Sequence, residues 1–278
     1  MTREIRIGDI SVGGNKPIAL IAGPCVIESR DICFEIAERA KSICDDLGIG
    51  YVFKASFDKA NRMSVSSFRG LGMEHGLGAL ADIRASLGVP VLTDVHEVWQ
   101  VEPVAEVVDV LQVPAFLCRQ TDLVLAAASA GKPVNFKKAQ FMSPAEMRPV
   151  AEKAASTGNE SILLTERGSS FGYGNLVVDM RSLVVMRELG YPVVFDATHS
   201  VQRPGGLGTA SGGDPQFVPY LVRAACAVGI DALFIETHPD PSKALSDAAT
   251  MISLDTLESV LSEARAVDAL VKNARAEP

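Results

Sequence analysis

No stretch of this sequence is apolar for long enough to cross a membrane, since a spanning helix needs roughly 20 consecutive apolar residues. The first ten residues also lack the apolar core of a secretory signal, because Arg3, Glu4, Arg6 and Asp9 are charged. These absences exclude a membrane protein. We therefore expect a soluble, cytoplasmic protein without a membrane partner.

An excess of positive charge is also missing. The chain carries 26 Lys and Arg residues against 34 Asp and Glu residues, which gives a net charge of −8 and a pI near 5.1. Nucleic acids and anionic membranes bind basic surfaces, so we expect neither as a partner. Any phosphate group would have to be bound by a local cluster of cations.

Cysteine is scarce, and its spacing forms no disulfide framework. The five cysteines, an odd number, stand at positions 25, 33, 44, 118 and 226. Such residues are typical of small buried side chains in a reducing compartment. Cys25 is the exception, because it follows Gly23-Pro24 directly after a predicted strand.

What the chain does contain is a repeated alternation of short apolar runs and longer segments with helical periodicity. Eight runs read as buried strands: 18–22, 51–53, 89–92, 108–111, 133–136, 162–164, 192–195 and 232–235. Continuously apolar strands separated by helices are typical of a parallel sheet buried on both faces. We predict an α/β fold, a (β/α)8 TIM barrel, with an open doubly wound sheet as the alternative.

The ends of these segments carry ordinary helix and turn signals. A capping box at 143–146 starts one helix, which Gly158 ends, and Gly48 ends another. Further helices are expected at 175–189, 215–228 and 253–273. Residues 1–14 alternate apolar and polar side chains around glycine turns, which predicts a short N-terminal β-hairpin that caps the barrel. No linker interrupts the order, so 1–278 is expected to be a single domain.

Chemically capable side chains follow each of the eight predicted strands. In a TIM barrel the carboxyl ends of the strands meet at one face, where the active site lies. The residues expected there are Cys25, Lys54, Thr93, Asp94, His96, Gln112, Lys137, Lys138, Glu166, Arg167, Asp196, His199, Glu236 and His238.

Cations are concentrated among these positions. Residues 51–62 turn from an apolar strand into a group containing Lys54, Lys59 and Arg62. With Arg119, Lys137 and Arg167 they would form a positive bowl suited to a multiply anionic substrate. A lysine at a strand end could instead form a Schiff base with a carbonyl substrate. Composition alone leaves both mechanisms open.

A metal site is also indicated. Cys25, His199 and Glu236 follow the first, seventh and eighth strands, and the first and eighth become neighbours when a barrel closes. Thiolate, imidazole and carboxylate together suit a divalent transition metal, and three ligands leave room for water or substrate. Asp247, in the loop after Glu236, is a candidate fourth ligand.

Several motifs carry a resemblance to a known family. Over residues 5–270 the chain resembles the 3-deoxy-D-manno-octulosonate 8-phosphate synthases, with the heptulosonate 7-phosphate synthases as the sister family. The motifs that carry it are 23–25, 53–62, 93–97, 112–116, 119–122, 137–138, 171–172, 196–199 and 236–241.

The resemblance implies a reaction and an assembly. Members condense phosphoenolpyruvate with D-arabinose 5-phosphate and water to the eight-carbon keto sugar phosphate of lipopolysaccharide biosynthesis. They release inorganic phosphate by cleavage of the C–O bond, without a Schiff base. They are homotetramers in which an arginine from a neighbouring subunit, at the position of Arg119 here, completes the pentose site.

The resemblance also implies roles for individual residues. Catalytic roles fall to Lys54, Lys59, Asp94 and His199. Substrate-binding roles fall to Ser56, Asn61, Arg62, Ser64, Gln112, Arg119, Lys137 and Arg167. Lys54 and Lys59 would also contact phosphoenolpyruvate, whereas Asn61, Arg62 and Ser64 would line the pentose phosphate site.

Two classes of the family differ at the position of Cys25, which is Asn in the metal-independent class. The presence of Cys25, His199, Glu236 and Asp247 therefore implies the metal-dependent class, with Zn, Fe, Mn, Co or Cd as the cofactor. An alternative function is that of a catalytically inactive barrel with a binding role. Such a barrel would lack some of the polar groups at the strand ends, and none is missing from this sequence. The glycine-rich segment 201–213 leaves open whether it closes over the site.

Overall fold

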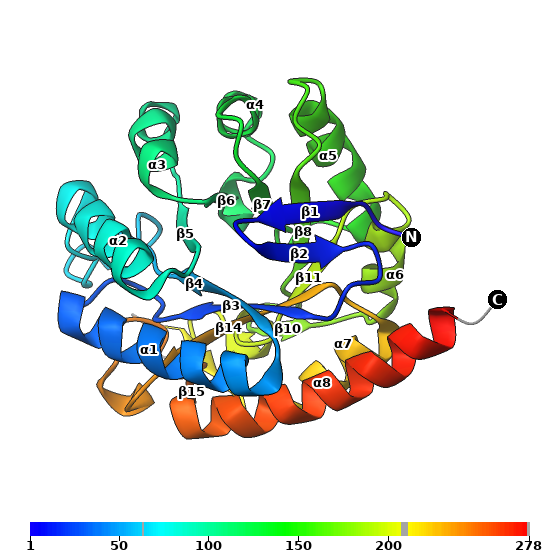
Figure 1. Cartoon of the computed structure of the whole chain (residues 1–278). Coiled ribbons are helices and arrows are strands. Elements are labelled where there is room, and N and C mark those ends of the chain that lie inside the picture. Colours follow the sequence, from blue (N-terminus) through cyan, green and yellow to red (C-terminus); the bar gives the residue numbers. More distant parts are fainter. Residues whose placement is uncertain (63, 207–210, 277–278) are drawn as a thin grey trace.

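The computed structural model describes residues 1–62, 64–206 and 211–276 (Figure 1). Within these residues, eight parallel strands form a closed barrel, because β14 pairs with β3 on one side and with β11 on the other. The strands are β3 (Ala19–Gly23), β4 (Gly50–Lys54), β5 (Val91–Asp94), β6 (Val110–Val113), β7 (Val134–Lys137), β8 (Ile162–Glu166), β11 (Val193–Asp196) and β14 (Ala232–His238). The predicted TIM barrel is confirmed.

Helices surround the barrel on its outer side (Figure 1). They are α1 (Arg30–Leu47), α2 (Met73–Leu87), α3 (Val101–Val107), α4 (Thr121–Ser129), α5 (Met147–Ala155), α6 (Arg181–Arg187), α7 (Val218–Val228) and α8 (Leu254–Ala276). Local sequence sets their limits: the Ser29 side chain accepts from Ile32 N at the start of α1, and Gly48 ends that helix with a φ of 65°. Among the described residues, no helix is both long and apolar enough to cross a membrane.

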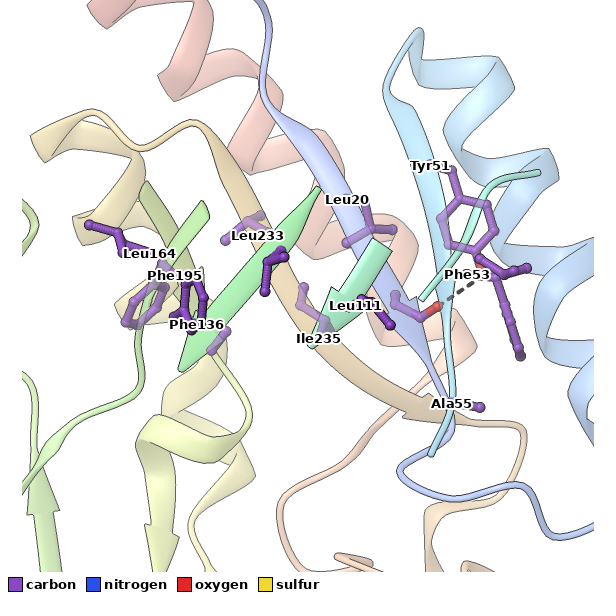
Figure 2. Close-up of a cluster of buried hydrophobic side chains, with 14 of the residues drawn as sticks. Leu20, Tyr51, Phe53, Ala55, Leu111, Phe136, Leu164, Phe195, Leu233 and Ile235 are labelled. Carbon is purple, nitrogen blue, oxygen red and sulfur yellow. Dashed lines mark hydrogen bonds between the residues drawn. The ribbon is translucent and has the colours of Figure 1, made fainter. Parts of the chain in front are cut away.

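The barrel strands separate two layers of apolar side chains. Leu20 and Ala22 of β3 face the helices, whereas Ala19 and Ile21 face the interior of the barrel. Figure 2 shows the outer layer, in which residues such as Phe136, Phe195 and Leu233 lie along the strands. This alternation places every second strand residue inside the barrel, where the residues nearest the carboxyl ends become polar.

The N-terminal hairpin, β1 (Glu4–Ile7) and β2 (Ile10–Gly13), lies across the barrel (Figure 1). Ile5, Ile7 and Val12 pack against the inner apolar cluster. Arg3 N donates to Gly190 O, 2.8 Å away, just before β11 begins. The hairpin therefore caps the barrel, as predicted; it covers the amino ends of the strands and leaves the opposite face for the site.

The loops at the carboxyl ends contain short elements. They are β9 (Ser169–Phe171), β10 (Asn175–Val177), β12 (Gln202–Arg203), β13 (Gly212–Gly213), β15 (Ile252–Ser253), and the 3-10 turns η1 (Val98–Gln100), η2 (Ala115–Leu117), η3 (Pro144–Glu146), η4 (His199–Val201), η5 (Pro215–Phe217) and η6 (Pro241–Lys243).

One helix prediction was wrong at its start. The segment 175–189 was expected to be one helix, but 175–177 pairs with 169–171 as a hairpin and α6 begins only at Arg181. Gly172 adopts a φ of 71° in the hairpin turn, a conformation that favours glycine. The Asp179 carboxylate accepts from Arg181 N at 3.0 Å and so provides the real helix start.

Candidate active site

Four side chains of types that can bind a metal meet at the carboxyl end of the barrel. The ligand atoms of Cys25, Glu236 and Asp247 all lie within 4.8 Å of one another. His199 Nε2 lies 3.7 Å from Glu236 Oε2 and 3.4 Å from Asp247 Oδ2. The structure thus brings together the four residues that the sequence proposed as ligands, although they are spread over more than 200 positions of the chain.

Neighbouring groups orient these side chains. Asp196 Oδ1 accepts from His199 N at 2.9 Å, and His199 Nδ1 lies 2.8 Å from Asp196 Oδ2. This directs Nε2 toward Glu236 and Asp247, the arrangement in which a carboxylate fixes the free nitrogen of a metal-binding histidine. Asp247 has a left-handed backbone with a φ of 51°, held by a bond from Thr250 N to Asp247 O at 2.9 Å.

The chemistry of the four residues fits a divalent cation. Glu236 Oε2 is buried and has no hydrogen-bond partner in the described part of the chain, so it has a free acceptor. Burial raises the pKa of the Cys25 thiol well above its usual range, and the charges of Asp247 and Glu236 raise it further. A cation would satisfy the free oxygen and favour the thiolate, since metal binding displaces the thiol proton. Sulfur, nitrogen and oxygen ligands together suit a transition metal.

Two buried lysines lie beside these four residues. Lys54 Nζ donates to Glu236 Oε1 at 3.1 Å and to Cys25 O at 3.0 Å. Lys137 Nζ donates to Asp196 Oδ2 and lies 3.2 Å from the centroid of the Phe234 ring. Each lysine therefore offsets the charge of one buried carboxylate and holds it in place.

A second polar group surrounds Asp94. Ser56 and Gln112 both donate to its carboxylate, and Lys59 Nζ donates to Ser56 Oγ at 3.0 Å. Burial alone would raise the pKa of Asp94, but the charges of Lys54 and Lys59 outweigh it and hold this pKa well below its usual range. Asp94 is therefore a carboxylate at neutral pH.

Arg167 provides a cation with unused hydrogen-bonding capacity. Its Nη2 donates to Gln202 Oε1 at 2.9 Å, whereas its buried Nη1 has no partner in the described residues. The preceding Glu166 fixes the backbone, because its Oε1 accepts from Arg167 N at 3.0 Å and from Gly168 N at 2.7 Å. Arg167 is thus held at the site with a donor available for an anion.

The predicted pentose-site residues lie in the loop between β4 and α2. Arg62 Nε donates to Phe68 O at 3.1 Å, and its buried Nη2 has no partner among described residues. Ser64 Oγ lies 2.9 Å from Ser66 Oγ, and Asn61 is exposed. This loop and segment 201–213 include residues 63 and 207–210, which lie outside the described residues, so closure of segment 201–213 stays an open question.

Arg119 does not join the buried groups within one chain. Its side chain is 61% exposed and its Nη1 lies 3.6 Å from Glu146 Oε1 on the surface. A role for Arg119 in this site would require another subunit.

Other strand-end residues have local roles. Thr93 Oγ1 donates to Ala55 O at 2.7 Å, and His238 Nδ1 accepts from Asp240 N at 3.0 Å. The fully buried Lys138 donates to Ser169 Oγ at 3.0 Å and lies 3.4 Å from Glu166 Oε1. These contacts organise the loops around the site.

Four residues that contact the site or lie directly behind it were not expected from the sequence. Ser246 Oγ lies 2.8 Å from Cys25 Sγ, and Gln202 lies between Arg167 and Asp247. Asn135 and Thr165 continue the hydrogen bonds of Gln112 into the barrel. The available indication was Asn135 itself, an amide within an otherwise apolar predicted strand.

Comparisons with known proteins agree on one family. The model of the DAHP synthetase I family matches residues 2–273. The 2-dehydro-3-deoxyphosphooctonate aldolase of Geotalea uraniireducens is 58% identical over 272 residues, which is 98% of this chain and 100% of that protein. The proteins with the same name from Syntrophotalea carbinolica and Geobacter sulfurreducens are 59% and 57% identical, over 98% of this chain and 98% and 100% of their own lengths.

Proposed function

Because the chain belongs to the DAHP synthetase I family, we propose that it catalyses the reaction of its 2-dehydro-3-deoxyphosphooctonate aldolase relatives in the synthetic direction. It condenses phosphoenolpyruvate with arabinose 5-phosphate and water, and it supplies lipopolysaccharide biosynthesis. C3 of phosphoenolpyruvate bonds to the aldehyde carbon, water adds at C2, and the C2–O bond breaks to release phosphate. The observation that carries the proposal is identity near 58% over the full length of the relative.

The cations are assigned to the anionic groups of the substrates. Arg167, whose Nη1 has no hydrogen-bond partner among the described residues, and Lys137 hold the phosphate of phosphoenolpyruvate. Lys59 contacts its carboxylate, and Gln112 and Lys54 complete this site. Two phosphates and a carboxylate repel one another, so fixed cations offset the repulsion and set the geometry of attack.

The pentose phosphate lies toward the loop between β4 and α2. Asn61, Arg62 and Ser64 line that site, and Arg62 supports this role because its buried Nη2 lacks a partner in the part of the chain that the structure describes. Ser56 links the two sites through Lys59 and Asp94. The Asp94 carboxylate fixes the Lys59 ammonium near the reacting carbons.

Cys25, His199, Glu236 and Asp247 would hold a divalent transition metal: Zn, Fe, Mn, Co or Cd. Such a cation, when bound, polarises a carbonyl oxygen and lowers the pKa of water. Asp196 fixes the His199 ring, and Lys54 fixes Glu236, so the ligand atoms are positioned before the cation arrives. Loss of activity on chelation, and its return when a metal is added, tests this assignment.

The substrate assignment is tested by phosphate release. The protein should release phosphate from phosphoenolpyruvate with arabinose 5-phosphate, one phosphate for each sugar consumed. Turnover with erythrose 4-phosphate instead would move the chain to the sister activity. A borohydride-trapped lysine adduct without stoichiometric phosphate would instead establish the Schiff-base alternative.

Cys25→Asn should weaken metal binding by at least about tenfold while some activity remains, because an amide oxygen replaces a thiolate. Metal content after dialysis and phosphate release would be measured together. Cys33→Ala is the matched control, since Cys33 is a buried thiol of α1 outside the four-residue group. Metal retention at native strength in Cys25→Asn would remove Cys25 from the proposed ligands.

The working form is a homotetramer in the cytoplasm. Arg119 and the neighbouring Phe116 are 61% and 53% exposed, respectively, which suits contact with a second copy of the chain. The free cysteines at 25, 33, 44, 118 and 226 are all buried, which suits a reducing compartment. Light scattering tests the tetramer, and a monomer with full activity would overturn the shared-site role of Arg119.

A further inference from the structure

A chain of buried hydrogen bonds crosses neighbouring barrel strands and ends at Asp94. It begins at Thr165 on β8, whose Oγ1 donates to Asn135 Oδ1 on β7 at 2.6 Å. Asn135 Nδ2 then donates to Gln112 Oε1 on β6 at 2.8 Å. Gln112 donates to Asp94 on β5, and Ser56, just after β4, donates to the other oxygen of the same carboxylate. All of these side chains are buried.

The Asp94 carboxylate at the end of this chain determines which group donates and which accepts in each hydrogen bond. An ionised carboxylate only accepts hydrogen bonds, so Gln112 must turn its NH2 group toward Asp94. The oxygen of Gln112 then faces Asn135, which must present its own NH2 group. The remaining oxygen of Asn135 needs a donor, and the Thr165 hydroxyl provides it. Reversing either amide would place two acceptors against each other.

We propose that Asn135 is a positioning residue, which holds the Gln112 amide in the orientation that the synthase reaction requires. The inference rests on the proposed function, because it is there that Gln112 and Lys59 contact phosphoenolpyruvate. Asn135 is fully buried behind Gln112, so it acts through that residue. The same orientation keeps Asp94 paired, and Asp94 in turn holds Ser56 under the Lys59 ammonium.

Asn135→Asp tests the direction of the bond with almost no change in shape. When protonated, the new carboxyl can donate to Gln112 Oε1 and accept from Thr165, as the amide does. When ionised, it can only accept, and it opposes the oxygen of Gln112. The variant should therefore work at low pH and fail as pH rises through the pKa of the new group.

Several titratable groups also lie near the chain of hydrogen bonds in the native protein. They are Asp94 at its end, Lys54, Lys59 and His96, which act on Asp94, and Lys137, which follows Asn135 by two residues and pairs with Asp196. Dividing the activity of the variant by that of the native protein at each pH removes their shared effects. The remaining change of this ratio with pH reports the ionisation of the introduced carboxyl group.

The experiment measures kcat/KM for phosphoenolpyruvate from about pH 6 to pH 9. The ratio for Asn135→Asp should fall at least about tenfold over this range, as expected for an unsatisfied buried acceptor. Thr165→Val removes only the donor to Asn135 and should lower kcat/KM by about 3- to 10-fold at every pH. Circular dichroism at each pH verifies that the variants are folded.

Asn159→Asp is the matched control. Asn159 also donates through its amide, to Ala128 O at 2.9 Å and Lys132 O at 2.8 Å, but it lies before β8 at the amino ends of the strands. The kcat/KM of Asn159→Asp divided by that of the native protein should not change with pH, even if the melting temperature of this variant does. A flat ratio for Asn135→Asp, or a loss that only follows unfolding, would overturn the inference. A native protein that releases no phosphate would instead overturn the proposed function, and the inference with it.

Discussion

Replacing His199 with glycine is expected to remove the bound metal and to lower kcat by more than about 100-fold, because changes even to residues behind metal ligands cost 10- to 100-fold. His199 Nε2 lies within 3.7 Å of the carboxylates of Glu236 and Asp247, two other proposed ligands. Its loss removes the group that lies between these two negative charges. Metal content and phosphate release would be measured on the same preparation.

The control for this variant is His75→Ala. His75 lies on the exposed face of α2 and is not among the four proposed metal ligands. It should retain both metal and turnover. Full activity of His199→Gly without bound metal would contradict the proposed mechanism, since the histidine would then be dispensable.

Lys54→Met is expected to lower the free energy of unfolding of the metal-free protein by about 3–5 kcal/mol, the usual cost of leaving one charge of a buried pair alone. Lys54 and Glu236 are 1% and 0% exposed, and Glu236 Oε2 already lacks a partner among described residues. Without the lysine, the carboxylate would keep His199 and the more weakly acting Lys59 as cationic neighbours. Urea unfolding measures the change.

Two further variants test whether the unpaired charge of Glu236 causes the loss of stability in Lys54→Met. Lys41→Met breaks an exposed pair with Asp45 on α1 and should cost no more than about 0.5 kcal/mol. Adding Glu236→Gln to Lys54→Met should recover part of the lost stability, because the unpaired charge is gone. If the double variant is as unstable as the sum of the two single changes, lost packing rather than unpaired charge would explain the result.

The barrel could be predicted because its strands are continuous apolar runs separated by helices of ordinary length. The convergence of Cys25, His199 and Glu236 followed from that prediction, since strand ends meet on one face of a barrel and each of these residues follows a strand. The hairpin at 169–177 was missed because each of its strands is only three residues long, so the second strand was merged with the helix that follows it; the glycine turn and the cap at Asp179 separate the two elements.

The hydrogen bonds of Asn135 also could not be predicted from the sequence. A polar residue inside a predicted strand indicates a buried partner, but which neighbouring strand supplies it depends on register. The structure pairs Asn135 with Gln112 across β6 and β7. The exposed position of Arg119 could not be interpreted from one chain for a related reason, since its partner would belong to another subunit.

The proposed metal site is tested most directly by phosphate release from phosphoenolpyruvate and arabinose 5-phosphate before and after treatment with a strong chelator, followed by addition of single divalent metals. We expect the chelator to abolish activity and at least one of Zn, Fe, Mn, Co or Cd to restore it. Activity that the chelator leaves unchanged, in protein shown to contain no metal, would contradict the assignment of Cys25, His199, Glu236 and Asp247 as a catalytic metal site.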